Sequence, residues 1–593
     1  MKKTLSKAML TLGVIAAVSM NGKAQVSPTV PNTTKDHKQQ VIGYITQWDA
    51  WKGDANGIPK SAYNFLNVDY SQYTILNFSF FGVAVDGSLH SADLRNKQIY
   101  QSGVDQAPGK MINDDIYSSF DAFFLKGDVQ PFYTIDSYLQ GLGYVDKGSG
   151  NWENTKTGEK GNMSPNGIIE IKQNPAFKSL LTIAHEKGVK VMAAIGGWSM
   201  CKHFGSMAAD ATKRKRFTDD CKRLIALGFD GIDIDWEYPG RAGMNFTGDP
   251  KDFNNYAVLM EDIRAAIGPD KLITGCFSAV IKPNEFDWAR LDKVMDYYNM
   301  MSYDFNGGWS NKAGHNSPLY DYPGAEYAEF SLDNTLKALK QQNVNLSKVN
   351  LGAGFYGRGV ICEGAAALNG KTVKVKATVQ PDGPIETCAD FDNYKLDVWD
   401  GTPNYSYIVS NSNGWTDKWD DAAKVPYRTN GKYFLSYDNV KSIGLKADYI
   451  RCEKLAGIIV WQVFGDMMNM STGNVTKGKF VYCPNTTSPL VNEINRVFAS
   501  KGACVTGVED VKATDHIGVF PNPSSGIVTI QGISADANQA LTLNVFNALG
   551  QKVYAQGVKT STVELDLSAH EKGIYFIQLQ RGEETFNKKI ILE

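Results

Sequence analysis

The chain has 593 residues, which is too long for one ordinary domain and long enough for a barrel with appended parts. Its 61 basic and 63 acidic residues nearly balance, so the composition favours neither nucleic acid nor an anionic membrane surface as a partner. The 11 Trp and 28 Tyr residues slightly favour a sugar-binding surface, although protein cores use the same residue types.

The N-terminus has the three parts of a secretory signal peptide. Three Lys residues lie within the first seven positions, residues 9–20 are apolar, and small residues end at Ala24. The apolar run is too short to span a membrane, and the sequence offers no other candidate for a transmembrane segment. We therefore predict a signal peptide at 1–24, a linker at 25–40 and an exported protein.

From about residue 41, short apolar segments alternate with helical stretches, a pattern typical of a parallel α/β fold. Eight such units within roughly 450 residues predict a (β/α)8 barrel, in which the chemistry lies at the C-terminal ends of the strands. A doubly wound open sheet is the alternative, but no segment resembles a dinucleotide-binding loop. The predicted strands are 41–45, 74–80, 189–195, a strand within 229–238, 272–278, 294–301, 349–354 and 457–461.

Two segments between these strands exceed normal loop lengths. One covers about 87–185 and contains Tyr144 and Trp152. The other covers about 360–434 and separates the seventh predicted strand from the eighth.

The fourth predicted strand carries three carboxylates. Because a strand alternates its faces, Asp233, Asp235 and Glu237 point to one side, and the apolar residues between them point to the other. Three neighbouring carboxylates repel one another, so at least one is expected to keep its proton well above the usual carboxyl range. Such a group can act as a general acid near neutral pH. The alternative is an exposed edge strand, but the apolar neighbours favour a buried one.

This strand resembles the Asp-Gly-x-Asp-x-Asp-x-Glu signature of glycoside hydrolase family 18, the chitinases and their relatives. The resemblance covers most of residues 41–500 and implies a barrel with a small α+β insertion at about 360–434, which walls one side of a substrate groove. Four further segments in order are similar to motifs of the third, sixth, seventh and eighth strands of that family: 194–199, Met301–Asp304, 355–359 and Trp461.

The resemblance implies substrate-assisted catalysis, in which the acetamido group of the substrate attacks the anomeric carbon. Glu237 would protonate the leaving oxygen and later activate water, and Asp235 would hydrogen-bond the acetamido N–H. Asp233 would share a proton with Asp235, Tyr303 would donate to the acetamido carbonyl, and Trp461 would lie beneath the distorted sugar. The other substrate-binding candidates, for each of which a purely structural role stays open, are Tyr44, Trp198, Met301, Asp304, Trp309 and Arg358.

One position departs from the family pattern. Ala194 stands where the family usually has a Ser whose hydroxyl helps to hold the innermost carboxylate. We expect an altered pH profile, not a loss of activity; a pH–rate curve identical to that of Ala194→Ser would contradict this.

After Gly502 the sequence changes to short alternating strands separated by turns, as in a β-sandwich. A carbohydrate-binding module is one interpretation, but this segment contains no Trp. Pro521-Asn522-Pro523, 547–551 and 573–575, in this order, resemble the C-terminal sorting domain of the type IX secretion system of Bacteroidota. We predict a linker at 501–515 and a sorting domain at 516–593 that engages the type IX machinery.

All eight Cys residues follow the signal peptide, where an oxidising location favours disulfides. Cys362–Cys388 and Cys483–Cys504 are the predicted bridges, whereas Cys276 and Cys452 lie in apolar stretches and are predicted to be buried thiols. No Cys or His spacing suggests a metal, and no cofactor is expected.

Together these features predict a secreted chitinase that acts on chitin or chitooligosaccharides. It would reach the cell surface or the medium through a Sec signal and type IX export, with a monomer as the default state. An endo-β-N-acetylglucosaminidase acting on N-glycans is the second hypothesis, since such enzymes share the Asp-x-Asp-x-Glu core. A chitin-binding lectin is the third, although such proteins usually lose the acid that Glu237 provides here.

Overall fold

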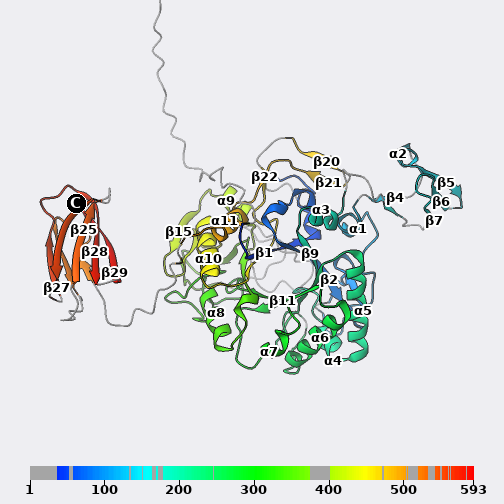
Figure 1. Ribbon diagram of the computed structural model, residues 1–593, viewed down its shortest axis with the longest axis horizontal. Helices are drawn as coiled ribbons and strands as arrows, with labels where there is room; N and C mark the ends of the chain where they lie inside the picture. Colours follow the sequence, from blue (N-terminus) through cyan, green and yellow to red (C-terminus); the bar gives the residue numbers. More distant parts are fainter. Residues whose placement is uncertain are drawn as a thin grey trace, which may run out of the picture. The chain divides into compact units, whose positions relative to one another are not determined.

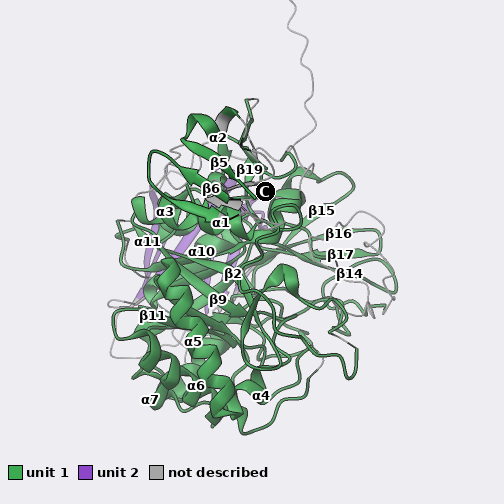
Figure 2. Ribbon diagram, turned by 90° about the vertical axis from the view of Figure 1, so that its right-hand side faces the viewer, with its two compact units in different colours: residues 1–504 green, residues 505–593 purple. Residues whose placement is uncertain are grey.

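A computed structural model gives the architecture of the chain (Figure 1). It describes residues 36–593 except 53–57, 100, 128, 132–134, 136, 150, 163–167, 171–177, 245, 374–400, 470–472, 478, 503, 505–517, 532–540, 548–550, 559, 561, 582 and 583. The predicted signal peptide and most of both predicted linkers lie outside the described residues. The chain divides into two compact units, 1–504 and 505–593 (Figure 2).

The first unit contains a closed barrel of eight parallel strands. Each strand pairs with the next one, and β1 pairs with both β2 and β18, which closes the sheet. The barrel is confirmed, and the open doubly wound sheet is wrong. Its strands are β1 (Gln40–Thr46), β2 (Ile75–Val83), β9 (Lys190–Gly196), β10 (Gly231–Asp235), β11 (Leu272–Ser278), β12 (Tyr297–Met301), β13 (Val349–Gly354) and β18 (Gly457–Trp461).

Helices surround the strands (Figure 1). The longest of the described helices, α5 (Ala211–Leu227), begins after Asp210, whose side chain accepts hydrogen bonds from the backbone N–H groups of Thr212 and Lys213. It ends at Leu227. The residue that caps it, Gly228, has a φ of 115°, which suits glycine and lets the chain turn toward β10. The helices are α3 (Leu180–Glu186), α4 (Phe204–Ala209), α5 (Ala211–Leu227), α6 (Asp252–Ile267), α7 (Trp288–Leu291), α8 (Leu332–Gln341), α10 (Val440–Cys452) and α11 (Pro489–Phe498).

The alternation of β10 separates two environments. Ile232, Ile234 and Trp236 are fully buried in the large core between the strands and the helices. Asp233 and Asp235 point to the other face, which is the inside of the barrel. The prediction of a buried strand is confirmed, and the alternative of an exposed edge strand is wrong.

Two insertions follow β2 and β13. The first contains β3 (Leu89–Ser91), α1 (Asp121–Lys126), α2 (Ser137–Gly141), the pair β4 (Val129–Pro131) and β8 (Ile168–Glu170), and a sheet of β5 (Tyr144–Gly148), β6 (Asn151–Asn154) and β7 (Lys160–Asn162). The second contains α9 (Tyr405–Ser410) and an antiparallel sheet of β14 (Arg358–Ile361), β17 (Tyr433–Ser436), β16 (Val425–Asn430) and β15 (Thr416–Asp420). This agrees with the predicted α+β insertion.

After β18 come two short antiparallel pairs. β19 (Met468–Asn469) pairs with β22 (Thr486–Thr487), and β20 (Val475–Lys477) pairs with β21 (Phe480–Tyr482).

The second unit is all-β, as predicted. Two antiparallel sheets share a core that includes Val528, Leu565, Leu543 and Ile577. One sheet has β23 (Gly518–Phe520), β24 (Ile527–Gln531) and β27 (Thr562–Asp566). The other has β26 (Lys552–Val558), β25 (Leu541–Asn547), β28 (Gly573–Arg581) and β29 (Glu584–Leu592).

The cysteines differ from their predicted pairing. A disulfide joins Cys452, the last residue of α10, to Cys504. The predicted Cys483–Cys504 bridge and the predicted free thiol at Cys452 are therefore wrong. The packing of the helices brings the end of α10 to the segment after α11, and the local sequence does not show this packing. Cys276 is a buried thiol, as predicted. Cys362 is a free, buried cysteine, so the predicted Cys362–Cys388 bridge is also wrong; Cys388 lies outside the described residues. Among the described residues, no helix has both the length and the apolar character needed to cross a membrane.

Candidate active site

The predicted site residues lie at the C-terminal ends of the barrel strands. Asp235 ends β10 and Glu237 follows it, Tyr303 lies two residues after β12, and Trp461 ends β18. Because all eight strands are parallel, these ends meet at one mouth of the barrel.

Asp233 is fully buried and held by three donors. Its Oδ2 accepts from the Tyr44 hydroxyl at 2.8 Å, and its Oδ1 accepts from the Thr274 hydroxyl at 2.5 Å and from the Asn299 amide at 3.2 Å. Burial raises the pKa of Asp233, whereas the hydrogen bonds from these donors lower it. On one side of β10, Asp233 pairs with Ala194 of β9, which has no hydroxyl to donate. On the other side it pairs with Thr274 of β11, whose hydroxyl takes that place.

Asp235 has a different environment, although it lies only two residues away. Its side chain is 4% exposed, and its Oδ1 has no hydrogen-bond partner among the described residues. Burial raises the pKa of Asp235 well above its usual range, and the charges of Glu237 and Asp233 raise it further. A hydrogen bond with the side chain of Cys276 acts in the opposite direction. Burial and the two acidic neighbours therefore favour the protonated form of Asp235.

Glu237 is half-buried and retains its proton close to neutral pH. Burial, followed by the nearby charge of Asp304, raises its pKa to about 7, against hydrogen bonds with the Tyr238 side chain and the Trp198 backbone. A carboxyl group with this pKa can donate a proton in one step and accept one in the next.

Tyr303 points into the barrel past Gly352. A Cβ on Gly352 would lie 2.7 Å from Cε1 of Tyr303, so glycine is needed for the ring to fit there. Burial raises the pKa of Tyr303 well above its usual value, which keeps the hydroxyl protonated and able to donate.

Trp461 belongs to an aromatic group at the barrel mouth. Its ring stacks on Phe80 at 5.7 Å between centroids and contacts Tyr44 at 5.6 Å with a tilt of 51°. Trp461 is half-buried, so part of the indole stays accessible. Tyr44 itself is buried beneath this group, where its hydroxyl reaches Asp233 rather than the open mouth.

Asp304 and Arg358 form a paired unit. Two guanidinium nitrogens of Arg358 lie 2.7 Å from the two carboxylate oxygens of Asp304, and the Tyr356 hydroxyl donates to the same carboxylate at 2.5 Å. The guanidinium also lies 5.0 Å from the ring centre of Trp309, which is 51% exposed. The pair thus supports an exposed aromatic ring.

The remaining candidates differ in exposure. Trp198 is 44% exposed beyond the end of β9, whereas Met301 is half-buried and packs against the interior cluster that contains Tyr44 and Cys276. The prediction from sequence missed Thr274, Asn299 and Phe80, whose only sequence signal was their place within predicted strands.

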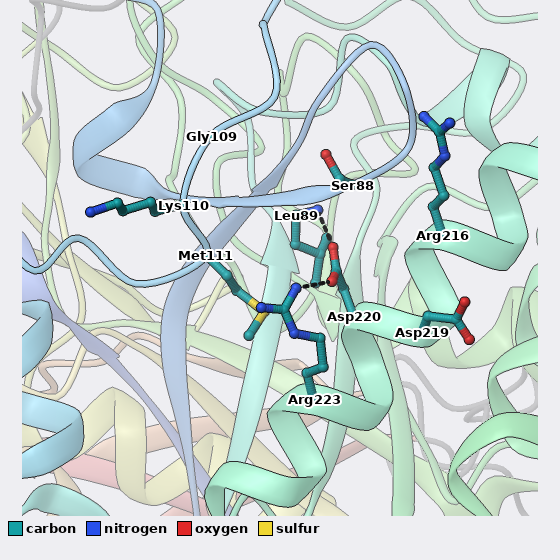
Figure 3. Close-up of a pocket in the computed structure, with 9 residues that line it drawn as sticks. All are labelled: Ser88, Leu89, Gly109, Lys110, Met111, Arg216, Asp219, Asp220 and Arg223. Carbon is teal, nitrogen blue, oxygen red and sulfur yellow. Dashed lines mark hydrogen bonds and ion pairs between the residues drawn. The ribbon is translucent and has the colours of Figure 1, made fainter.

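A hollow of about 330 Å³ lies elsewhere, between residues 88–111 and α5 (Figure 3). Its three cations are already paired: Arg223 contacts Asp220 at 2.9 Å, Arg216 contacts Asp86 at 2.8 Å, and Lys110 contacts Asp114 at 2.8 Å. None of the predicted site residues lines it. Among the described residues, no group of three or more His, Cys, Asp or Glu side chains is arranged to hold a metal ion.

The sequence is similar to two known families and to several named proteins. The family model described as "Glycosyl hydrolases family 18" matches residues 40–466, and the one described as "Secretion system C-terminal sorting domain" matches residues 518–593. A protein named chitinase A1 from Niallia circulans is 27% identical over 94% of this chain and 77% of its own length. One named probable endochitinase from Caenorhabditis elegans is 31% identical over 48% of this chain and 45% of its own length.

A third relative, named chitinase ChiA, comes from Flavobacterium johnsoniae and is 24% identical over 95% of this chain, which spans 34% of that protein. Among solved structures, chitinase ChiA74 from Bacillus thuringiensis has a TM-score of 0.55 at 21% identity and covers 94% of this chain and 85% of its own. A group IV chitinase from Ostrinia furnacalis in complex with allosamidin has a TM-score of 0.53 at 21% identity and covers 78% of this chain and 99% of its own. These two structures share the fold of this chain.

Proposed function

The chain belongs to family 18 of the glycosyl hydrolases, and we propose that it is a chitinase that hydrolyses β-1,4 bonds between N-acetylglucosamine units with retention. The observation that carries the proposal is the row of three carboxylates on β10 and its extension, where each has a different environment. The names of relatives from Niallia circulans and Flavobacterium johnsoniae support chitin as the substrate class.

In the proposed first step, Glu237 gives its proton to the glycosidic oxygen while the acetamido oxygen of the substrate attacks the anomeric carbon. Its pKa of about 7 keeps the acid form available at neutral pH. The C–O bond to the leaving sugar breaks, and an oxazolinium intermediate forms. In the second step the Glu237 carboxylate takes a proton from water, which attacks from the same face and gives retention.

Asp235 and Tyr303 would position the acetamido group. The Asp235 Oδ1, which has no partner among the described residues, is available to accept the acetamido N–H and to offset the positive charge of the intermediate. The Tyr303 hydroxyl would donate to the acetamido carbonyl and fix its direction of attack. Asp233, held by Tyr44 and Thr274, would share the proton that leaves Asp235.

The binding groove would lie along the barrel mouth. We assign Trp461 to the floor beneath the distorted sugar, and the exposed rings of Trp198 and Trp309 to outer sugar positions. The sheet β14–β17 would form one wall.

The C-terminal unit would direct the protein to the surface. Its match to the secretion sorting family supports export across the outer membrane by the type IX system, with residues 1–24 as the signal for the earlier step.

The test compares the wild-type protein with Glu237→Gln, and with Glu186→Gln as a control at an exposed Glu of α3. Each is incubated with chitohexaose and, separately, with a high-mannose N-glycoprotein, and the products are analysed by mass spectrometry. We expect short chitooligosaccharides from the wild type and the control, and a loss of about 10²–10⁴-fold in Glu237→Gln. Glycan release with intact chitohexaose would instead indicate an endo-β-N-acetylglucosaminidase, and binding without cleavage would indicate a lectin.

A further inference from the structure

A buried thiol lies next to the row of carboxylates. Cys276 on β11 is free and 3% exposed, and its Sγ lies 2.8 Å from the Tyr44 hydroxyl oxygen. That hydroxyl has one proton, which it donates to Oδ2 of Asp233. The S–H of Cys276 must therefore be the donor in the contact with Tyr44, unless it turns to another acceptor.

The other acceptor is Asp235. Ile234 of β10 pairs with Gly275 of β11, so Asp235 and Cys276 are the next residues on two adjacent strands, and both lie inside the barrel. The Asp235 Oδ1 has no hydrogen-bond partner among the described residues. Burial and the charges of Asp235 and Asp233 raise the pKa of Cys276 well above its usual value, so the group remains a thiol and keeps its proton to donate.

We propose that Cys276 is a positioning residue for the hydrolysis: its S–H is donated to Tyr44 or to Asp235, and this choice sets the pH at which Asp235 releases the proton that it shares with Asp233. When Asp235 is ionised, the thiol supports it; when Asp235 is protonated, the thiol returns to Tyr44. This inference rests on the proposed function, in which Asp235 accepts the acetamido N–H.

The surroundings leave the thiol with few competitors. Among the described residues, the titratable groups that influence the pKa of Cys276 or Asp235, or are influenced by them, are acids, phenols and thiols, and no Lys, Arg or His is among them. These neighbours are Tyr44, Cys201, Asp233, Glu237, Tyr238, Tyr256 and Tyr303. A single weak donor can therefore have a measurable effect on the protonation of Asp235.

The test measures kcat/KM for chitohexaose against pH in Cys276→Ala, Cys276→Val and Cys276→Ser. Removing the donor raises the pKa of Asp235, so in the Ala and Val variants the acidic limb is expected to move to higher pH by about 0.5–1 unit, the effect of one weak hydrogen bond to a charged group. The Ser variant keeps a donor, and its limb should stay close to that of the wild type. Val fills the site in case Ala does not fold.

Cys221→Ala is the matched control, because Cys221 is an equally buried free thiol on α5. It should lose stability without a change in the pH profile. Titration of the Asp235 carboxyl by ¹³C NMR gives the same comparison without turnover. Profiles and titrations of Cys276→Ala and Cys276→Val that superimpose on the wild type would overturn the inference, whereas an inactive wild type with a shifted NMR titration would overturn only the proposed function.

Discussion

Replacing Gly352 by Ala is expected to disturb catalysis without removing any polar group. The new Cβ would lie 2.7 Å from Cε1 of Tyr303 and 2.8 Å from the carbonyl oxygen of Met300. Contacts between carbon atoms are normally about 3.5–4.0 Å, so one neighbour must move by about 1 Å. Because Met300 is fixed by the pairing of β12 with β13, the Tyr303 ring is the part that can move. A misplacement of this size lowers kcat by about 10²-fold, with a smaller effect on KM.

The assay is the measurement of kcat, KM and thermal stability on chitohexaose. Overpacking also lowers the free energy of unfolding, by about 1–3 kcal/mol. Gly364→Ala is the control, since a Cβ there meets no atom within 4 Å. In a Tyr303→Phe background the additional loss in kcat should be small, because the two changes act on the same ring. A Gly352→Ala variant with the kcat of the wild type would refute the reasoning.

Three further predictions concern pH and stability. The pKa of Glu237 is raised to about 7, so the acid form is present below that pH and kcat/KM should fall as the pH rises through about 7; a fall that begins only above pH 9 would contradict this. Lys446→Met should lower the free energy of unfolding by about 3–5 kcal/mol, because it leaves the Asp438 carboxylate, which lies 2.6 Å from Nζ, buried without its partner. Denaturant unfolding measures the loss, and adding Asp438→Asn should restore part of it. Replacing Cys452 and Cys504 by Ser should lower the free energy of unfolding by about 4 kcal/mol, because the disulfide closes a loop with a sequence separation of 52 residues. A reductant should lower the stability of the wild type but not that of the double Ser variant.

The barrel could be predicted from sequence because its strands are short apolar segments separated by helical ones. Three predicted strands, 272–278, 349–354 and 457–461, have the observed bounds, since turn residues and polar residues mark their ends. The strand predicted at 294–301 begins instead at Tyr297, because Val294 and Met295 close the turn after α7 by bonding back to Leu291. Local pattern does not record such tertiary constraints, and the disulfide of Cys452 was missed for the same reason.

The site was predictable only in part. The spacing of Asp233, Asp235 and Glu237 indicates both their shared face and their raised pKa values, because alternation and repulsion are local properties. Thr274 and Cys276 carry no such signal. Their contacts depend on the register of β11 beside β10, in which Thr274 pairs with Asp233, and a strand pattern does not fix that register.

The three carboxylates share a strand and its extension but not an environment, and that difference supports the separate roles that we propose for them. Asp233 has hydroxyl and amide donors on three other strands, β1, β11 and β12, and these hydrogen bonds oppose the rise in pKa that burial causes. Asp235 is buried beside two acidic neighbours, which favours its protonated form, and in the proposed mechanism a substrate N–H would stabilise its charged form. Glu237 lies nearest the open mouth and titrates near neutral pH. The pKa of each carboxyl group therefore depends on the donors that other barrel strands supply, which is why changes at Tyr44, Thr274 or Cys276 should alter the pH profile before they abolish turnover.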